Sequence, residues 1–306
     1  MAPTFAEATA IKAVDSHTYA AYFDSEWCVG SVPHGGVVTS VFLRVAAAHF
    51  RTTLAAQNQP NTISLHLEFL RRTQEGSAIL VVREVKLGRQ TSTIHVALSQ
   101  DGCEEVVGYL TQSNIETETG LSLKTLWSLH PAPLPPPADF AALLAARQDP
   151  NWVEQTDKPY PKFRKVGNRV RTFLPRGGQL LPGLVDEWLR FGSGENFTNE
   201  SMGFVCDQFP SVIEGLWRRE MGDRRILPFW YPTVVLNLDV KKTLPPEGVE
   251  WLFVRVRTKC INNGRMDLEI VVLDDAGETV ALSHHVVLVV GSERNMAARR
   301  NGQTKI

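Results

Sequence analysis

An internal repeat constrains the fold of this 306-residue chain more than any other feature. The stretch EGSAILVVR at residues 75–83 aligns without gaps to EGVEWLFVR at residues 247–255, and five of the nine positions are identical. At an offset one residue shorter, LHLE at residues 65–68 stands against LNLD at residues 236–239. A duplicated unit explains these matches better than chance, so we expect one structural unit to be built twice.

Each half predicts one helix followed by a run of strands. In the first half, apolar residues form a single helical stripe between residues 37 and 57: Val38, Phe42, Val45, Ala46 and Phe50. Strand-like segments follow at residues 62–72, 76–88, 90–100 and 104–114. The second half has a helix-like stretch at 200–220, despite Pro210, and strands at 232–242, 248–259, 265–275 and 278–290. Short turns at Asp101-Gly102 and Ala276-Gly277 favour antiparallel pairing, so the predicted class is α+β.

The repeat also predicts the domain limits. We expect an N-terminal unit at residues 1–116 and a C-terminal unit at residues 180–291. Between them, residues 117–179 hold five prolines between Pro131 and Pro137, which exclude a helix or a central strand there. This segment is therefore predicted to be a linker on the surface. The polar residues 292–306 are predicted to be a frayed tail.

Composition narrows the class of protein. The net charge of −1 shows no basic excess of the kind that nucleic-acid binding favours. The four cysteines form no CxxC pair, which indicates a reduced compartment and, with no signal peptide, a cytoplasmic protein. No apolar run reaches the ~18 residues that a membrane helix needs. The final residues TKI are only a loose approximation to a peroxisomal SKL signal. The expected partner is an apolar small molecule, and self-association stays open.

The order of motifs resembles the TesB-like acyl-CoA thioesterases, a family with a double hotdog fold. PHGGVVTSVFL, at residues 33–43, resembles the Gly-Gly start of that family's first helix. SLHLEFLRR, at residues 64–72, resembles its strand ending in Phe-Leu-Arg, and VDEWLRF, at residues 185–191, resembles the strand that opens its second half. The resemblance implies two hotdogs, each a long helix wrapped by an antiparallel sheet, and hydrolysis of an acyl thioester without a metal or cofactor.

The resemblance also implies catalytic positions. The family holds one water with an Asp, a Thr and a Gln. MGFVCD places the aspartate at Asp207, and PTVVLNLDV places the threonine at Thr233. The glutamine position falls on His285, where this chain departs from the family. Neighbouring side chains in a strand point to opposite faces, so His285 is expected to face the site and His284 to face away.

These residues suit thioester hydrolysis, which needs a positioned water, a base and donors for the oxyanion. A carboxylate supplies the base, and a hydroxyl and an imidazole orient the water. Backbone N–H groups at His34, Gly35 and Gly36 would hold the thioester carbonyl at a helix start. Each residue also has a structural interpretation: a helix cap for Asp207, an ordinary strand residue for Thr233, a core histidine for His285 and a tight turn for the glycines.

Other functions stay open. Arg71, Arg72, Lys241 and Lys242 end equivalent strands and would meet CoA phosphates or only solvent. No GxSxG, P-loop or metal-ligand spacing is present in the sequence. Two alternatives to a thioesterase remain: a dehydratase, cyclase or isomerase acting on a polyketide-like substrate, and a non-catalytic acyl-binding protein. The first is suggested by the change of Gln to His at position 285, which would suit altered chemistry.

Overall fold

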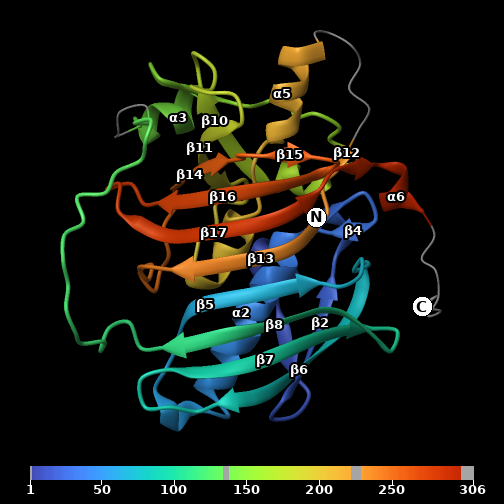
Figure 1. Ribbon diagram of the computed structural model, residues 1–306, viewed down its shortest axis with the longest axis vertical. Coiled ribbons are helices and arrows are strands. Elements are labelled where there is room, and N and C mark those ends of the chain that lie inside the picture. The colour runs from blue at the N-terminus through green and yellow to red at the C-terminus, as the bar shows by residue number, and fades with distance from the viewer. Residues whose placement is uncertain (1, 134–137, 222–228, 298–306) are drawn as a thin grey trace.

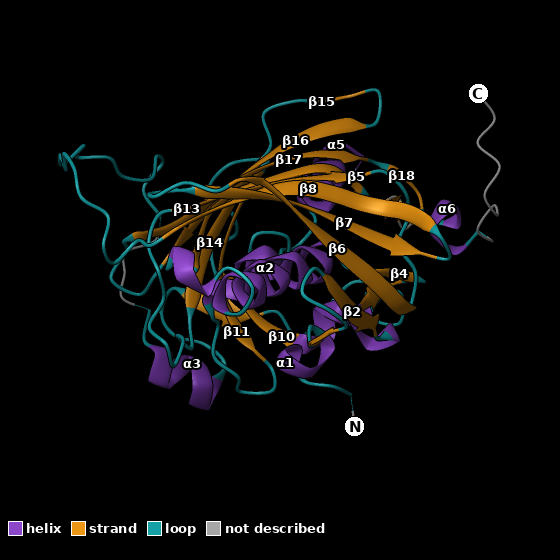
Figure 2. Ribbon diagram, turned by 90° about the horizontal axis from the view of Figure 1, so that it is seen from below, coloured by secondary structure: helices purple, strands orange, loops and turns teal. Residues whose placement is uncertain are grey.

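One antiparallel sheet of 14 strands bends around a central helix, α2 (Gly35–Arg51) (Figures 1 and 2). The computed structural model describes residues 2–133, 138–221 and 229–297. The first half of the sheet has the order β1-β2-β6-β7-β8-β5. These strands are β1 (Ile11–Ala13), β2 (Thr18–Phe23), β5 (Asn61–Phe69), β6 (Gly76–Lys86), β7 (Ser92–Gln100) and β8 (Cys103–Ser113). The predicted α+β double hotdog is confirmed.

The second half continues the same sheet in the order β13-β17-β16-β14-β11-β10-β9. These strands are β9 (Trp152–Glu154), β10 (Val170–Pro175), β11 (Leu184–Phe191), β13 (Thr233–Val240), β14 (Leu252–Arg257), β16 (Arg265–Leu273) and β17 (Thr279–Leu288). The fourteenth strand, β15 (Ile261–Asn262), pairs with β16 beside this order. Short elements outside the large sheet include α1 (Phe5–Ala8), β3 (Cys28–Val29), β4 (Val32–Pro33), β12 (Phe229–Trp230) and β18 (Val290–Gly291).

The two halves meet edge to edge at the strands β5 and β13. Leu67 lies opposite Leu236, and Leu65 lies opposite Leu238, and all four leucines are buried. The inner faces of both halves therefore contribute to one hydrophobic core. Pairing also removes the two sheet edges that separate units would leave open.

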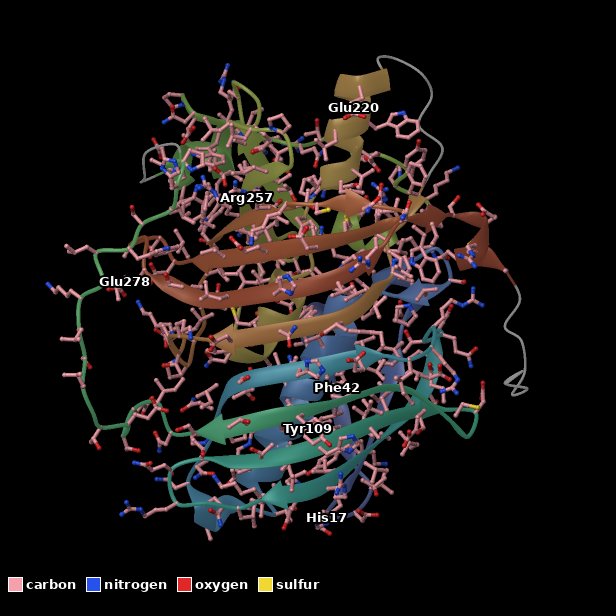
Figure 3. The ribbon with its side chains drawn as sticks, viewed as in Figure 1. His17, Phe42, Tyr109, Glu220, Arg257 and Glu278 are labelled. Atoms are coloured by element: carbon pink, nitrogen blue, oxygen red, sulfur yellow. The ribbon has the colours of Figure 1, made fainter. Side chains whose placement is uncertain are left out.

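The helix α2 fills the concave face of the sheet. Its Phe42 is fully buried, whereas Tyr109 of β8, on the opposite face of the sheet, is 47% exposed (Figure 3). Period-2 alternation holds throughout β7, whose burial alternates residue by residue. The sheet thus has one face against the helix and one face outward.

The second helix is divided, which corrects the prediction of one helix at residues 200–220. The structure has α4 (Met202–Val205) and α5 (Val212–Met221), with a turn between them that contains Asp207 and Pro210. Proline lacks an N–H group and disfavours helical backbone in the residue before it. The helix therefore ends before Pro210 and restarts beyond it.

The segment 117–179, expected as a surface linker, contains part of the sheet. Its strand β10 pairs with β11, and β9 pairs with β10. Its helix α3 (Phe140–Ala146) and Trp152 cover the outer face of the second half, where Trp188 and Phe253 form a second apolar core with them. Residues 134–137, within the run of prolines, lie outside the described residues.

Part of the C-terminal tail is docked rather than frayed. The helix α6 (Glu293–Met296) carries Asn295, which is fully buried. Its side-chain amide donates to the carbonyl of Val29 at 2.8 Å, and its Oδ1 accepts from the N–H of Ser31 at 3.0 Å. Residues 298–306, which include the TKI sequence, lie outside the described residues. No helix in the described ranges is long and apolar enough to cross a membrane.

Candidate functional site

A cavity of about 340 Å³ opens between the start of α2, the turn after α4 and the strand β13. Its walls are mostly apolar. They include Val32, Phe69, Val166, Phe229, Met266 and Leu268. A small group of polar residues also lines it, among them His34, Asp207, Gln208 and Thr233. An apolar cavity with a few convergent polar groups is the usual form of a small-molecule site.

The carboxylate of Asp207 lies at the N-terminus of α2. The N–H of Gly36 donates a hydrogen bond to Asp207 Oδ2 at 2.7 Å. A helix N-terminus carries unsatisfied N–H groups and a positive dipole end, and both stabilise a negative charge. The Asp207 side chain is only 11% exposed. The sequence interpretation of Asp207 as a helix cap is therefore partly right, but the helix it caps belongs to the other half of the chain.

Close contact between α2 and α4 explains the glycines of the first helix. A Cβ atom on Gly36 would lie 2.8 Å from the carbonyl oxygen of Gly203. A Cβ atom on Gly203 would lie 2.7 Å from the methyl group of Thr39. The N–H of Phe204 donates to Ser40 Oγ across the same contact at 3.0 Å. Only glycine permits this approach, which brings Asp207 to the helix start.

The imidazole of His285 lies behind Asp207, with Nδ1 at 3.6 Å from Asp207 Oδ1. His285 is fully buried, whereas His284 is exposed. The pair therefore divides as predicted between an inward-facing His285 and an outward-facing His284. His285 is not among the residues that line the cavity. It contacts the carboxylate from the protein side rather than facing the open space.

Hydrogen bonds fix the tautomer of His285. Ser283 has one hydroxyl proton, and it donates this proton to the carbonyl of Asn237. Ser283 Oγ must then accept from His285 Nε2, which lies at 2.9 Å. Nδ1 is left as a bare lone pair that faces Asp207, and no hydrogen-bond partner is found for it in the described part of the chain. Burial lowers the pKa of His285 to about 4, although Asp207 opposes this shift, so the ring is neutral at pH 7.

A second imidazole, His34, contacts Asp207 from the other side. His34 precedes α2 as its N-cap, and its Nδ1 accepts from the N–H of Gly36 at 3.2 Å. The same nitrogen lies 3.5 Å from Asp207 Oδ2. Burial lowers the pKa of His34, and the charge of Asp207 opposes that effect. Asp207 thus lies between two neutral imidazoles.

Thr233, Gly35 and Gln208 complete the polar lining. Thr233 is the first residue of β13 and lines the same cavity as Asp207. Gly35 also lines the cavity, and within the described residues no acceptor is found for its N–H. The side-chain oxygen of Gln208 is buried without a hydrogen-bond partner in that same part of the chain. Gln208 was not among the predicted site residues, although its position beside Asp207 was a usable signal.

The four basic strand-end residues separate into two groups. Arg71 and Arg72 line the cavity, where Arg72 also donates to the backbone carbonyl of Asn295 at 2.6 Å. Lys241 forms an ion pair with Asp239, and Lys242 forms one with Asp274. Neither lysine lines the cavity. Only the arginines are therefore placed to meet a ligand there.

Comparisons with known proteins identify the family to which the chain is similar. The model of the acyl-CoA thioesterase N-terminal domain matches residues 23–113, and that of the C-terminal domain matches residues 136–289. A thioesterase-like protein, TwmA, from Talaromyces wortmannii is 36% identical, with 98% of this chain and 96% of that protein covered.

Solved structures share the fold at low sequence identity. A hot dog fold protein from Alicyclobacillus acidocaldarius has a TM-score of 0.71 at 19% identity, with 94% of this chain and 98% of that chain covered. An acyl-CoA thioesterase II, TesB2, from Mycobacterium marinum has a TM-score of 0.64 at 17% identity, with 94% and 98% covered.

Proposed function

We propose, since the chain belongs to the acyl-CoA thioesterase family, that it hydrolyses an acyl-CoA or acyl-carrier thioester with Asp207 as the general base. The observation that carries this proposal is the position of Asp207. It is a nearly buried carboxylate that lines an apolar cavity and accepts a hydrogen bond from the N-terminus of α2. A base in this position is within reach of a water held against a bound acyl group.

The residues around the cavity supply the other parts of the reaction. Thr233 and Gln208 would orient the attacking water, and the free N–H of Gly35 would donate to the oxyanion. Asp207 takes a proton from the water as the oxygen adds to the thioester carbonyl carbon. The carbon–sulfur bond then breaks, and the thiol leaves with the proton that Asp207 returns. The products are a free acid and a free thiol.

The proposed role of His285 changes with the structure, from holding the water to positioning Asp207. Its Nδ1 lone pair faces Asp207 Oδ1 at 3.6 Å, a separation that a proton on either atom would shorten. When Asp207 gains the proton of the water, His285 can accept a hydrogen bond from the new O–H group. The neutral ring thus stabilises the protonated carboxyl that forms during the reaction.

Arg71 and Arg72 would recognise the phosphates of CoA at the cavity, and the apolar walls would hold the acyl chain. The four cysteines are free, which agrees with the proposed cytoplasmic location in a reduced compartment.

A non-hydrolytic reaction is the second candidate, and one observation favours it. Two neutral imidazoles flank Asp207, and an Asp–His pair is also suited to proton transfer in a dehydration or isomerisation. The test is thiol release from a panel of acyl-CoA substrates, with the products identified by mass spectrometry. Equal amounts of free acid and free thiol support the thioesterase. A product that keeps the thioester, with no thiol released, would replace it with the second candidate.

A further inference from the structure

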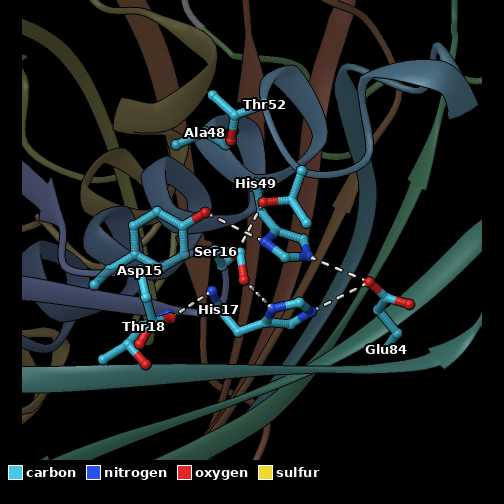
Figure 4. A network of polar contacts seen from close by, with 10 residues as sticks. Asp15, Ser16, His17, Thr18, Ala48, His49, Thr52 and Glu84 are labelled. Atoms are coloured by element: carbon cyan, nitrogen blue, oxygen red, sulfur yellow. Dashed lines mark hydrogen bonds and ion pairs between the residues drawn. The ribbon is translucent and has the colours of Figure 1, made fainter.

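A cluster of two histidines and a glutamate lies at the opposite end of α2 from the cavity (Figure 4). His17 comes from the loop before β2, His49 from the last turn of α2, and Glu84 from β6. Their ligand atoms all lie within 4.8 Å of one another. Gly35, at the cavity, is separated from His49 by about 21 Å of helix, at 1.5 Å per residue. The cluster is therefore distinct from the proposed active site.

One nitrogen of the buried member has no hydrogen-bond partner among the described residues. His49 is fully buried, and its Nε2 has no hydrogen-bond partner among the described residues. That nitrogen lies 4.0 Å from Glu84 Oε1, which is too long for a hydrogen bond. Leaving a buried polar atom unpaired is unfavourable, so this atom points to a missing group. With Nδ1–H donating to the hydroxyl of Tyr19, the lone pair of Nε2 is available to bind a cation.

The surrounding hydroxyl groups orient both rings. His49 Nδ1 lies 3.2 Å from the hydroxyl of Tyr19, and His17 Nδ1 lies 2.8 Å from Ser16 Oγ. With each Nδ1 engaged, both Nε2 atoms face Glu84 (Figure 4). Partners on the far ring nitrogen are typical of histidines that bind metals, because they fix the ring orientation. Asp15 also holds the loop, since it accepts from the backbone N–H of His17 at 2.8 Å.

The spacing approaches that of a tetrahedral site. In a zinc site with bonds of about 2.0–2.1 Å, neighbouring ligand atoms are roughly 3.3 Å apart. His17 Nε2 and Glu84 Oε1 are 3.3 Å apart. The 4.0 Å from His49 Nε2 to Glu84 Oε1 requires a small movement of Glu84, whose side chain is 33% exposed and free to adjust. The His17 side chain is 42% exposed, so the site is open to solvent for a fourth ligand.

We propose that His17, His49 and Glu84 bind a Zn²⁺ ion that ties the C-terminal end of α2 to β6 and to the loop before β2. The two imidazoles and one carboxylate are the ligand set that zinc accepts. The ion would pair the lone pair of His49 with a positive charge and join three segments that are distant in the sequence. Its role is structural, because the cluster lies far from the cavity. The sequence offers no metal spacing since each ligand comes from a different element.

The test uses the full chain, stripped of metal with EDTA and returned to chelator-free buffer. Calorimetric titration with Zn²⁺ alone should show one site per chain. A concentration of zinc about 100-fold above its Kd should raise Tm by roughly 5 °C. His17→Gln and Glu84→Gln should each weaken binding at least ~10-fold. Both positions are partly exposed, so these variants should fold.

The matched control is His66→Gln, which alters another histidine beside a glutamate. His66 Nε2 lies 3.4 Å from Glu68 Oε1, but among the described residues no third His, Cys, Asp or Glu ligand joins this pair. Its variant should bind zinc like the wild type. Absence of zinc binding to the wild-type chain would overturn the proposal. So would unchanged binding in His17→Gln and Glu84→Gln, which would place the ion elsewhere. Thiol release should be equal in wild type and His17→Gln, so failure of the zinc site stays distinct from failure of the proposed hydrolysis.

Discussion

Asp207→Asn should separate activity from stability. The substitution keeps the shape of the side chain and removes the base. The amide oxygen of asparagine can still accept from the N–H of Gly36, which lies 2.7 Å from the carboxylate. The amide N–H₂ would face His285 Nδ1, the buried lone pair that lacks a partner in the described structure. The variant should therefore fold with its local geometry intact.

The expected magnitudes follow from those two contacts. Pairing a buried unsatisfied acceptor is worth about 1–3 kcal/mol. Loss of the negative charge at the start of α2 costs roughly 0.3–1 kcal/mol. The net change is about 1 kcal/mol of added stability, or roughly 2 °C in Tm. Removal of a general base should lower kcat by about 10²–10⁴-fold, equal to roughly 3–5 kcal/mol in the activation barrier.

Thiol release from acyl-CoA, with saturating substrate, measures the first effect, and thermal unfolding followed by circular dichroism measures the second. Asp239→Asn is the matched control, because Asp239 lies on β13 with its side chain 52% exposed and paired with Lys241. That variant should match the wild type in rate, with stability changed by less than about 1 kcal/mol. If Asp207→Asn keeps a rate within tenfold of the wild type, Asp207 is not the base. If its Tm falls sharply, the proposed tautomer of His285 is wrong.

Three further predictions concern buried ionisable groups. In the thiol-release assay, His285→Gln should retain part of the activity, and His285→Ala should lose more because Asp207 then lacks its partner. His284→Ala should have almost no effect on the rate. Equal losses in His284→Ala and His285→Ala would refute the proposed role of His285. The pKa of His285 is about 4 in the folded state and about 6.5 in the unfolded state, so the folded protein loses about 3 kcal/mol of stability as the pH drops from above 6.5 to 4. His285→Gln should flatten this part of the profile of Tm against pH. An unchanged profile would count against burial as the cause of the lowered pKa. Burial raises the pKa of Glu187 well above its usual value, so the folded state loses stability as the pH rises above the pKa that Glu187 has in the unfolded chain. Glu187→Gln should therefore raise Tm at pH 8 and have little effect near pH 4.5. A lower Tm of this variant at pH 8 would contradict the prediction.

The sequence determined the repeated unit, the strand positions and the facing of the histidine pair. These features depend on local patterns. Alternation with a period of two puts His284 and His285 on opposite faces of the strand, and the resemblance to the thioesterase family assigned the inner face to His285. The repeat also matched residues 65–68 to residues 236–239, and the structure shows that these segments belong to β5 and β13, the strands that join the halves.

Other features depended on contacts that no local pattern reports. The role of segment 117–179 was missed because a short strand such as β10 takes its identity from the neighbour with which it pairs. The helix at 200–220 was predicted as continuous because its apolar period outweighed Pro210, whereas the observed break places Asp207 in a turn.

The site itself was decided by tertiary structure. Asp207 and Thr233 could be selected by resemblance, but the hydrogen bond between Gly36 and Asp207 joins the two halves of the chain. That contact exists because two glycines, Gly36 and Gly203, let α2 and α4 approach closely. The cluster of His17, His49 and Glu84 likewise forms only when a loop, a helix end and a strand are packed together. Periodicity specifies which face of each element is buried, whereas the meeting of polar groups from distant segments is fixed only by how the elements pack.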